Sequence, residues 1–491
     1  MRLRPGTKVP TAAMCGAVVV LTGAASASAE AGAPVAADRP AASAGSWGVA
    51  QEVPGSASLN VGGFARIMSV SCASSGNCSA GGYYSDTPGH MQAMVVSEKN
   101  GHWGTAEEVP GTASLNRGGE AQIFSLSCAR PGDCSGGGYY TGRHRRSEAF
   151  VVTQVNGRWG SAEQVPGTAA LNKAGNAETY AVSCTSAGNC GAGGRYESHP
   201  GSYQAFVVTE QRGRWSRAEE VPGTGALNKG GMATVNSISC PSAGNCSAGG
   251  AYASRPALSQ LFVVTQRHGR WGKAEQAPGT AGLSKDIDDA VYSISCTSAG
   301  TCAASAQYAD QSSSFQALIL TERNGKWAKA MRVRGLAGFG ASNSALGDMS
   351  CPSAGNCTTG GWYYVPAVGH IQAFVISERH GRWGRAQNVP GLAVLNAGNN
   401  AQVQPVACRS AGNCSAGGYY TESFGHSPAF VVNQINGRWG TAEEVPGIAA
   451  LNTGNLATVV SISCAPKGTC SAGGAYQDSA GYQAFVLSQK G

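Results

Sequence analysis

The stretch that decides the fold is Cys128–Gly167, which reads CARPGDCSGGGYYTGRHRRSEAFVVTQVNGRWGSAEQVPG. It contains two cysteines with five residues between them, a tyrosine, an apolar run, an Asn-Gly turn, one tryptophan and a Val-Pro-Gly segment. Runs of β-branched and aromatic residues bounded by glycine turns are typical of short β-strands. We therefore expect strands at 123–128, 134–140 and 149–154, and a fourth strand that begins at Trp159.

Near-copies of this unit fill the chain. Eight tryptophans recur at intervals of 56 residues, at Trp47, Trp103, Trp159, Trp215, Trp271, Trp327, Trp383 and Trp439. Eight cysteine pairs follow the same period: Cys72/Cys78, Cys128/Cys134, Cys184/Cys190, Cys240/Cys246, Cys296/Cys302, Cys351/Cys357, Cys408/Cys414 and Cys464/Cys470. Four short strands within a period of this length are typical of the blades of a β-propeller.

A solenoid of stacked repeats is the alternative architecture, and the two ends of the chain favour the propeller. The last repeat stops in the turn that precedes the tryptophan elsewhere, while Trp47 stands near the start without the rest of its repeat. An N-terminal strand that completes the last blade explains both ends and leaves no open sheet edge. The sequence thus predicts an all-β, eight-bladed propeller with four-stranded blades over residues 46–491, closed by that strand.

The N-terminal segment indicates export. Residues 1–29 combine a basic start, an apolar run and A-x-A cleavage motifs ending at Ala27 and Ala29, which is the pattern of a secretory signal. The apolar run is too short to span a membrane. Residues 30–45 are rich in Ala, Pro and Ser, and we expect a disordered linker. The 16 cysteines that follow the signal form an even number, as expected for a secreted, extracellular protein.

Charge and composition limit the partners. The net charge of +7 falls to +4 when Arg2, Arg4 and Lys8 leave with the signal (7 − 3). No long basic run remains, so we expect no nucleic-acid partner. The many glycines (71) and the low charged fraction (13%) agree with short strands joined by turns.

The repeat unit can be written S-x-S-C-x5-C-x-A-G-G-x-Y. It is similar to the cysteine-paired propeller repeats of secreted proteins from high-GC Gram-positive bacteria, and the resemblance covers residues 46–491. The resemblance implies the fold and secretion, and it implies no particular activity.

The repeated cysteines and tyrosines have structural interpretations. A disulfide within each pair would stabilise its hairpin by about 2 kcal/mol in the chain-entropy model. Zinc binding is the alternative, but C-x5-C lacks the spacing and histidine partners of zinc sites. A tyrosine stands twelve residues after the first cysteine of every pair, where packing between blades is expected and a sugar-stacking platform is the alternative.

Three groups of residues are candidate ligand contacts on the face that carries the loops between second and third strands. Trp362 lies outside the 56-residue period and, with Tyr364, is a candidate exposed platform. Arg143 and Arg145 form a basic loop suited to an acidic polymer. Repeated Leu-Asn segments could read glycan hydroxyls, although Asn before Gly is also a standard turn. Their asparagines are Asn60, Asn116, Asn172, Asn228, Asn396 and Asn452.

The fifth and sixth repeats depart from the pattern, and a single site on a symmetric ring must come from such departures. In the fifth repeat, Asp286, Asp288 and Asp289 replace the Asn-containing segment. They are candidate Ca²⁺ ligands, with a solvated acidic turn as the alternative. We expect no other cofactor.

Repeated loops favour a secreted, monomeric, non-catalytic protein that binds polysaccharide, or a secreted or cell-surface protein, through its loop face. The alternative is an extracellular carbohydrate-active hydrolase or lyase, or a quinoprotein-like oxidoreductase, with its site at the divergent blades 5 and 6. Glycosidases need facing carboxylates, and acidic residues on the loop face are sparse outside the three aspartates. A structural scaffold without a small ligand is the third hypothesis.

Overall fold

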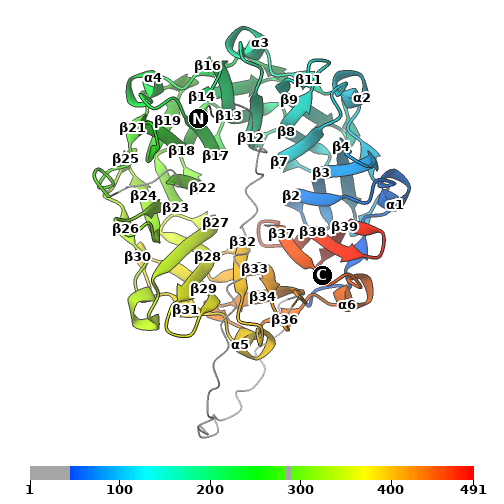
Figure 1. Ribbon diagram of the computed structural model, residues 1–491, viewed down its shortest axis with the longest axis vertical. Helices are drawn as coiled ribbons and strands as arrows, with labels where there is room; N and C mark the ends of the chain where they lie inside the picture. Colours follow the sequence, from blue (N-terminus) through cyan, green and yellow to red (C-terminus); the bar gives the residue numbers. More distant parts are fainter. Residues whose placement is uncertain (1–44, 284–288, 424, 491) are drawn as a thin grey trace, which may run out of the picture. The chain divides into compact units, whose positions relative to one another are not determined.

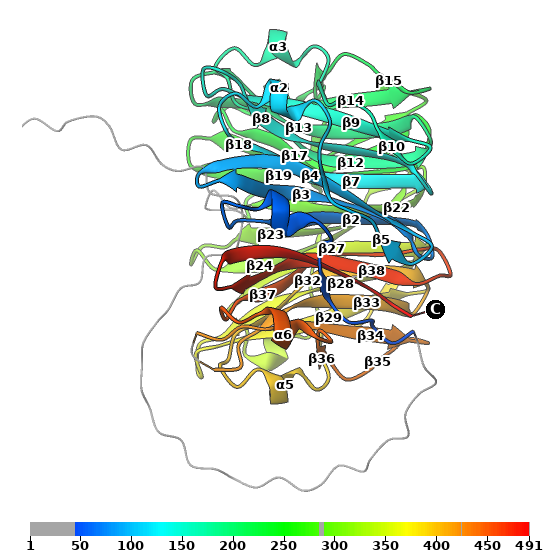
Figure 2. The same ribbon diagram turned by 90° about the vertical axis from the view of Figure 1, so that its right-hand side faces the viewer.

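The computed structural model describes residues 45–283, 289–423 and 425–490, which form eight antiparallel sheets. Figure 1 shows the sheets as blades around a common axis, and Figure 2 shows the same ring from the side. The eight-bladed, all-β prediction is confirmed. The predicted signal segment (1–29) and residues 30–44 of the predicted linker lie outside the described residues.

Within a blade the strands follow one another outward from the axis. The innermost strands of blades 1 to 8 are β2 (Arg66–Ser74), β7 (Ala121–Arg130), β12 (Ala177–Ser186), β17 (Ala233–Ser242), β22 (Ala290–Ser298), β27 (Asn343–Ser353), β32 (Ala401–Ser410) and β37 (Ala457–Cys464). The second strands are β3 (Asn77–Thr87), β8 (Asp133–Thr141), β13 (Asn189–His199), β18 (Asn245–Arg255), β23 (Thr301–Ala309), β28 (Asn356–Val365), β33 (Asn413–Tyr420) and β38 (Cys470–Asp478). The third strands are β4 (His90–Lys99), β9 (Ser147–Val155), β14 (Ser202–Gln211), β19 (Leu258–Arg267), β24 (Phe315–Arg323), β29 (His370–Arg379), β34 (Ala429–Ile435) and β39 (Gly481–Ser488).

The fourth strand is split into two short pieces that both pair with the third strand. In blade 2, Trp159 pairs with Gln154, and Glu163 pairs with Val151. The pieces of blades 1 to 7 are β5 (His102–Trp103) and β6 (Glu107–Glu108), β10 (Arg158–Trp159) and β11 (Glu163–Gln164), β15 (Arg214–Trp215) and β16 (Glu219–Glu220), β20 (Arg270–Trp271) and β21 (Glu275–Gln276), β25 (Lys326–Trp327) and β26 (Met331–Arg332), β30 (Arg382–Trp383) and β31 (Gln387–Asn388), and β35 (Arg438–Trp439) and β36 (Glu443–Glu444).

A single helical turn, which the sequence pattern did not indicate, follows the Val-Pro-Gly segment in most blades. Gly111 precedes one such turn with φ of 87°, a left-handed value that favours glycine. The turns are α1 (Ser56–Leu59), α2 (Thr112–Leu115), α3 (Thr168–Leu171), α4 (Thr224–Leu227), the 3₁₀ turn η1 (Leu336–Phe339), α5 (Leu392–Leu395) and α6 (Ile448–Leu451). None of the helices in the described ranges is long and apolar enough to cross a membrane.

The ring closes through the N-terminal segment, as predicted. Strand β1 (Gln51–Glu52) pairs with β39 of blade 8, Gln51 opposite Val486 and Glu52 opposite Phe485. Trp47 forms a further bridge to Gln489. Blade 8 therefore obtains its outer strand from the other end of the described chain, and its innermost strand contacts that of blade 1.

The cysteine pairs form the disulfides expected of them. Each of the eight bonds joins the two cysteines of one repeat and closes the hairpin between the first and second strands. The first-strand partners are Cys72, Cys128, Cys184, Cys240, Cys296, Cys351, Cys408 and Cys464. The second-strand partners are Cys78, Cys134, Cys190, Cys246, Cys302, Cys357, Cys414 and Cys470.

The second-strand cysteines are structural and are not open to a ligand. All eight are buried, with 1–4% exposure: Cys78, Cys134, Cys190, Cys246, Cys302, Cys357, Cys414 and Cys470. Their sulfur atoms lie between blades; that of Cys302, for example, is 3.4 Å from the Ser247 hydroxyl of the preceding blade. A sulfur bonded to another sulfur is no thiolate and cannot ligate zinc, so the zinc alternative is wrong.

The repeated tyrosines have the packing role expected of them. They are buried in hydrophobic clusters that combine residues of adjacent blades. The hydroxyl of Tyr196, for example, donates to Glu220 at 3.1 Å. With their rings covered, these tyrosines offer no platform for a sugar.

Serines of the S-x-S-C motif join neighbouring blades. In blade 2, Ser125 Oγ accepts from the amide of Val182 (3.0 Å), and Ser127 Oγ accepts from the amide of Cys184 (2.9 Å). The same pair of bonds recurs at the junctions of blades 8 and 1, 1 and 2, 4 and 5, and 5 and 6. At the junction of blades 7 and 8 the serine positions hold Pro405 and Ala407.

A second set of bonds between blades comes from a buried Glu or Gln in the third strand. Glu210 of blade 3 accepts from Ser135 and Thr153 of blade 2, both at 3.3 Å. In blade 2 the equivalent Gln154 donates to Ser97 of blade 1 at 3.0 Å. An ionisable carboxyl and a neutral amide thus occupy the same buried position in different blades.

We expect Ser127→Ala to lower the free energy of unfolding by about 1 kcal/mol, because the amide of Cys184 loses its acceptor. Ala407→Ser supplies the serine that blade 7 lacks at this motif position, and we expect this change to raise the free energy of unfolding. Urea unfolding followed by circular dichroism measures both changes. Unchanged unfolding of Ser127→Ala would show that these bonds contribute nothing.

We expect Glu210→Gln to stabilise the protein at pH 7 and to have little effect near pH 4. Burial raises the pKa of Glu210, against the opposing hydrogen bonds of Ser135 and Thr153. The folded state therefore binds the proton of Glu210 more tightly than the unfolded state does. As a result, the free energy of unfolding falls as the pH rises from the carboxyl pKa of the unfolded chain through the raised pKa of the folded protein. Melting temperatures across this pH range test the prediction, with the exposed Glu219→Gln as control. A lower melting temperature at pH 7 would contradict it.

Candidate functional site

Each innermost strand bulges at the same position. In blade 2, the pairing of β7 with β8 skips Phe124 between Ile123 and Ser125. Ile123 is buried, and Ser125 bonds the next blade, so we infer that the bulged side chain turns toward the ring axis. The bulged residues, called the bulge ring below, are Met68, Phe124, Tyr180, Asn236, Tyr292, Gly347, Gln404 and Val460.

The bulge ring differs from blade to blade, whereas the tryptophans and cysteines recur in every unit. Its members are half-buried. Phe124 and Tyr180, on the adjacent blades 2 and 3, lie with ring centroids 5.2 Å apart. Phe124 also stacks on Tyr139 at 5.6 Å. Two aromatic members of the bulge ring thus contact each other at blades 2 and 3.

Arg195 is the centre of this group. It occupies the position in β13 that Tyr139 occupies in β8. Its guanidinium carbon lies 5.5 Å from the ring centroid of Tyr180 and 4.8 Å from that of Tyr203, distances at which a cation is attracted to an aromatic face. The Arg195 cluster, as defined here, comprises Phe124, Tyr139, Glu178, Tyr180, Arg195 and Tyr203.

Glu178 binds both the arginine and a tyrosine of the cluster. Arg195 Nη2 donates to Glu178 Oε2 at 3.3 Å, and the Tyr180 hydroxyl donates to the same oxygen. Burial, followed by the charge of Glu178, raises the pKa of Tyr180 well above its usual value. Burial alone would lower the pKa of Arg195, but the neighbouring tyrosines and Glu178 outweigh it and raise that pKa. The site therefore holds a fixed cation, a carboxylate and a neutral phenol.

Two polar atoms in or beside the cluster are buried and lack a hydrogen-bond partner within the described part of the chain. One is the donor Arg195 Nε, and the other is the acceptor Asn176 Oδ1. The amide of Asn176 donates from its other side to the Tyr203 hydroxyl at 3.1 Å. A buried polar atom without a partner is costly, so each of these two atoms has hydrogen-bonding capacity that water or a ligand can satisfy.

The predicted basic loop borders this cluster. Arg143 and Arg145 are exposed in the loop between β8 and β9. The side chain of Arg146 lies over Gly175, the residue before Asn176. The positive charge of the loop is therefore placed next to the Arg195 cluster, on the same face of the ring.

Aromatic and apolar side chains extend the surface on other blades. Phe64 of blade 1 is 41% exposed and lies 5.6 Å from Tyr83 and 5.3 Å from Tyr482, measured between ring centroids. Met232 and Leu456 occupy the Phe64 position in blades 4 and 8, and both are exposed.

The predicted platform residues Trp362 and Tyr364 lie in blade 6, three blades away from Arg195. Trp362 pairs with Ala345 as Arg195 pairs with Glu178, so it occupies the Arg195 position of its blade. Both side chains are half-buried, and alternate residues of a strand share one face. They remain candidate contacts that the structure does not join to the Arg195 cluster.

The six predicted asparagines are buried, with 2–7% exposure. Asn60 donates to the Tyr482 carbonyl (2.9 Å) and Gln483 Oε1 (2.8 Å), and accepts from the amide of Phe64 (2.8 Å). Asn116, Asn172, Asn228 and Asn396 make corresponding bonds to the preceding blade, and Asn452 accepts from the amide of Gln477. This geometry gives them the structural role that was the alternative to ligand binding.

The predicted Ca²⁺ ligands fall on a partly described segment. Asp286 and Asp288 lie outside the described residues. Asp289 is buried, and its Oδ1 accepts from the amide of Ala309 at 2.8 Å, a bond like those of the asparagines. Within the described ranges, no group of three or more His, Cys, Asp or Glu side chains is arranged to hold a metal ion.

Asp348 is a carboxylate that sequence reasoning missed. It lies in the irregular stretch of β27 between Leu346 and Met349, where other blades place a motif serine. The side chain is exposed, yet the surrounding protein reduces its solvation and raises the pKa of Asp348 to about 7. The replacement of a repeated serine by aspartate was the signal that could have identified it.

The chain matches no protein-family profile and no curated protein. It is similar in fold to solved structures at 8–12% sequence identity. The β-propeller domain of the Trilobed protease from Pyrococcus furiosus (8% identity, TM-score 0.41) aligns over 78% of this chain and 95% of that one. An ulvan lyase (10%, TM-score 0.41) aligns over 74% and 91%, and the Trypanosoma rangeli sialidase (12%, TM-score 0.38) over 78% and 56%.

Proposed function

We propose that this chain is a secreted, non-catalytic propeller that binds an acidic polysaccharide at the Arg195 cluster. The observation that carries the proposal is Arg195 itself, a cation held between two tyrosine rings with a buried Nε that has no partner among the described residues. The eight disulfides support an oxidising extracellular location.

The chemistry of the cluster suits a charged sugar. The apolar face of a pyranose can pack against Phe124 or Tyr203, as aromatic rings pack against other apolar surfaces. Arg195 Nε can donate to a carboxylate or hydroxyl, and Asn176 Oδ1 can accept from a hydroxyl. The adjacent basic loop attracts a polyanion over a longer range, and salt weakens this attraction.

We expect the double variant Glu178→Gln/Arg195→Tyr to bind acidic polysaccharide at least tenfold more weakly. The variant copies blade 2, where Gln122 donates to the Tyr139 hydroxyl at 2.8 Å, so it removes the ion pair without leaving an unpaired buried charge. Isothermal titration of the purified protein with an alginate or polygalacturonate fraction measures the change.

The control is Arg255→Gln, which removes one exposed positive charge from blade 4, whereas the double variant leaves the net charge unchanged. We expect the control to lose less affinity than the double variant, and an equal or larger loss would contradict binding at the Arg195 cluster. Absence of binding by the wild-type protein to every acidic and neutral polysaccharide would overturn the proposal and favour a protein partner.

A second candidate function, glycoside hydrolysis, is favoured by the hydrogen bond from Tyr180 to Glu178. Some glycosidases use a tyrosine nucleophile, and a carboxylate that accepts the phenol proton would activate it. The raised pKa of Tyr180 opposes this role, because it disfavours the phenolate.

On the binding proposal, the wild-type protein is expected to release no reducing ends from polysaccharides that it binds. Tyr180→Phe is expected to bind them with similar affinity, since Phe keeps the ring that contacts Arg195. A reducing-end assay gives the answer: turnover that Tyr180→Phe abolishes while binding persists would establish the hydrolase instead.

A further inference from the structure

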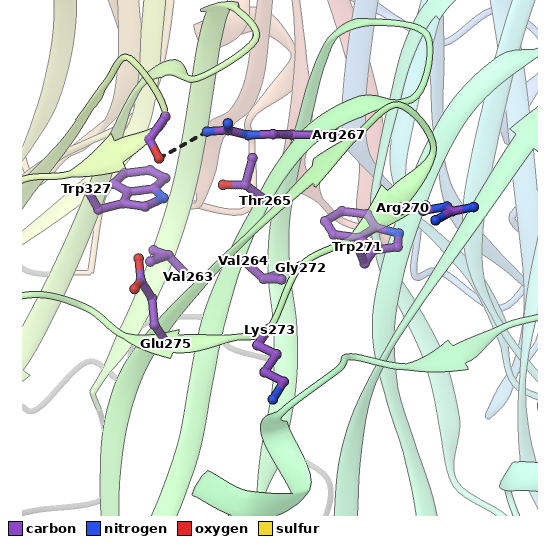
Figure 3. A pocket seen from close by; sticks show the side chains of 11 residues that line it. Val263, Val264, Thr265, Arg267, Arg270, Trp271, Gly272, Lys273, Glu275 and Trp327 are labelled. Atoms are coloured by element: carbon purple, nitrogen blue, oxygen red, sulfur yellow. Dashed lines mark hydrogen bonds between the residues drawn. The ribbon is translucent and has the colours of Figure 1, made fainter.

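A cavity of about 450 Å³ lies between blades 4 and 5. It is formed by β19, by the two pieces of the fourth strand of blade 4, and by the turn between β24 and β25 of blade 5. Figure 3 shows Trp271, Trp327, Arg267 and Lys273 around it. Because this turn joins third to fourth strands, the cavity lies at the opposite end of the strands from the loop face and the Arg195 cluster.

The two tryptophans give the cavity apolar walls. Trp271 is half-buried, and Trp327 is 8% exposed. The indole nitrogen of Trp327 has no hydrogen-bond partner among the described residues, and the same holds for the equivalent nitrogens of Trp47, Trp159, Trp383 and Trp439. The missing bond is therefore common to the repeat, and what the two tryptophans contribute to this cavity is the surface of their rings.

Positive charge predominates around the opening. Arg267, Arg270 and Lys273 are exposed cationic side chains, and Glu275 is the one acidic residue in the lining. Arg267 is held in place, because its Nη2 donates to the Gly325 carbonyl at 3.2 Å (Figure 3). The cavity therefore attracts an anion, while Glu275 adds an acceptor for hydroxyl groups.

We propose that this cavity is a second binding site, for a sugar ring that bears a carboxylate, that is, a uronic acid unit. Its volume lies within the range of small-ligand sites and exceeds what a simple inorganic anion fills. The carboxylate binds Arg270 and Lys273, and the sugar ring packs against Trp271 and Trp327. Glu275 accepts from a hydroxyl of the sugar.

The test uses the indole resonances of the purified protein labelled with ¹⁵N-tryptophan. The variants Trp271→Phe and Trp327→Phe assign the two indole N–H signals. Trigalacturonate is expected to shift both signals, and neutral maltotriose is expected to leave both in place. No shift with trigalacturonate, or equal shifts with maltotriose, would overturn the proposal.

Two variants locate the site. Arg270→Gln/Lys273→Gln is expected to weaken trigalacturonate binding, read from the Trp327 signal, at least tenfold. The control Arg214→Gln/Arg217→Gln changes the equivalent residues of blade 3 and is expected to bind normally, and an equal loss there would refute the site. Glu178→Gln/Arg195→Tyr should leave the Trp327 shift intact, so failure here and failure at the Arg195 cluster are distinguishable.

Discussion

The ring depends on hydrogen bonds that cap the innermost strands. Each innermost strand is a sheet edge, with backbone amides that no neighbouring strand pairs. Ser69 and Ser71 of blade 1 accept from two of these amides in blade 2, those of Leu126 and Cys128, which are two residues apart and therefore on the same edge. One serine pair thus satisfies the edge of the next blade and fixes its distance and rotation. The pair recurs at five of the eight junctions and, together with the buried hydrophobic clusters that span adjacent blades, joins the sheets into one body.

This constraint decides where variation is tolerated. The cysteines close the hairpin, the serines cap the next edge, and the asparagines tie each interblade segment to the preceding blade, so these positions are occupied by structural contacts. The bulged residue lies between a residue with a buried side chain and the motif serine. Its own side chain neither packs in the core of the blade nor makes the serine's hydrogen bond to the next blade. It can change from Met68 to Tyr180 to Val460 without loss of the ring. A repeat protein of this kind therefore gains an individual site at the bulge and at the neighbouring position of the second strand, where Arg195 lies.

The same distinction explains what the sequence could predict. The 56-residue period of tryptophans and cysteine pairs was enough for blade number, disulfides and closure, because each requires only spacing. The asparagines were harder: the asparagine of a Leu-Asn segment looks the same in the sequence whether its amide faces solvent or is buried, and Asn60 is buried against blade 8. Arg195 was not predicted from the sequence, because its position varies among the repeats: Gly-Gly-Arg-Tyr stands where three other repeats have Gly-Gly-Tyr-Tyr and the rest have Ala, Gln or Trp before the last tyrosine. Only the fold brings Arg195 beside Glu178 and Tyr203.

The junctions between blades differ in the number of serine bonds that they contain. Blade 7 continues directly into blade 8 through β36 and α6, and this junction lacks both motif serines, with Pro405 and Ala407 in their places. The backbone joins blade 8 to blade 1 only through the short pairing of β1 with β39. Here both serines are present, Ser461 and Ser463, and Glu98 adds bonds to two further serines of blade 8. The junction of blades 2 and 3 carries the same set, two serine bonds and two bonds to Glu210. Closure of the ring therefore uses the same polar contacts as a covalently continuous junction, in addition to the two residue pairs of β1.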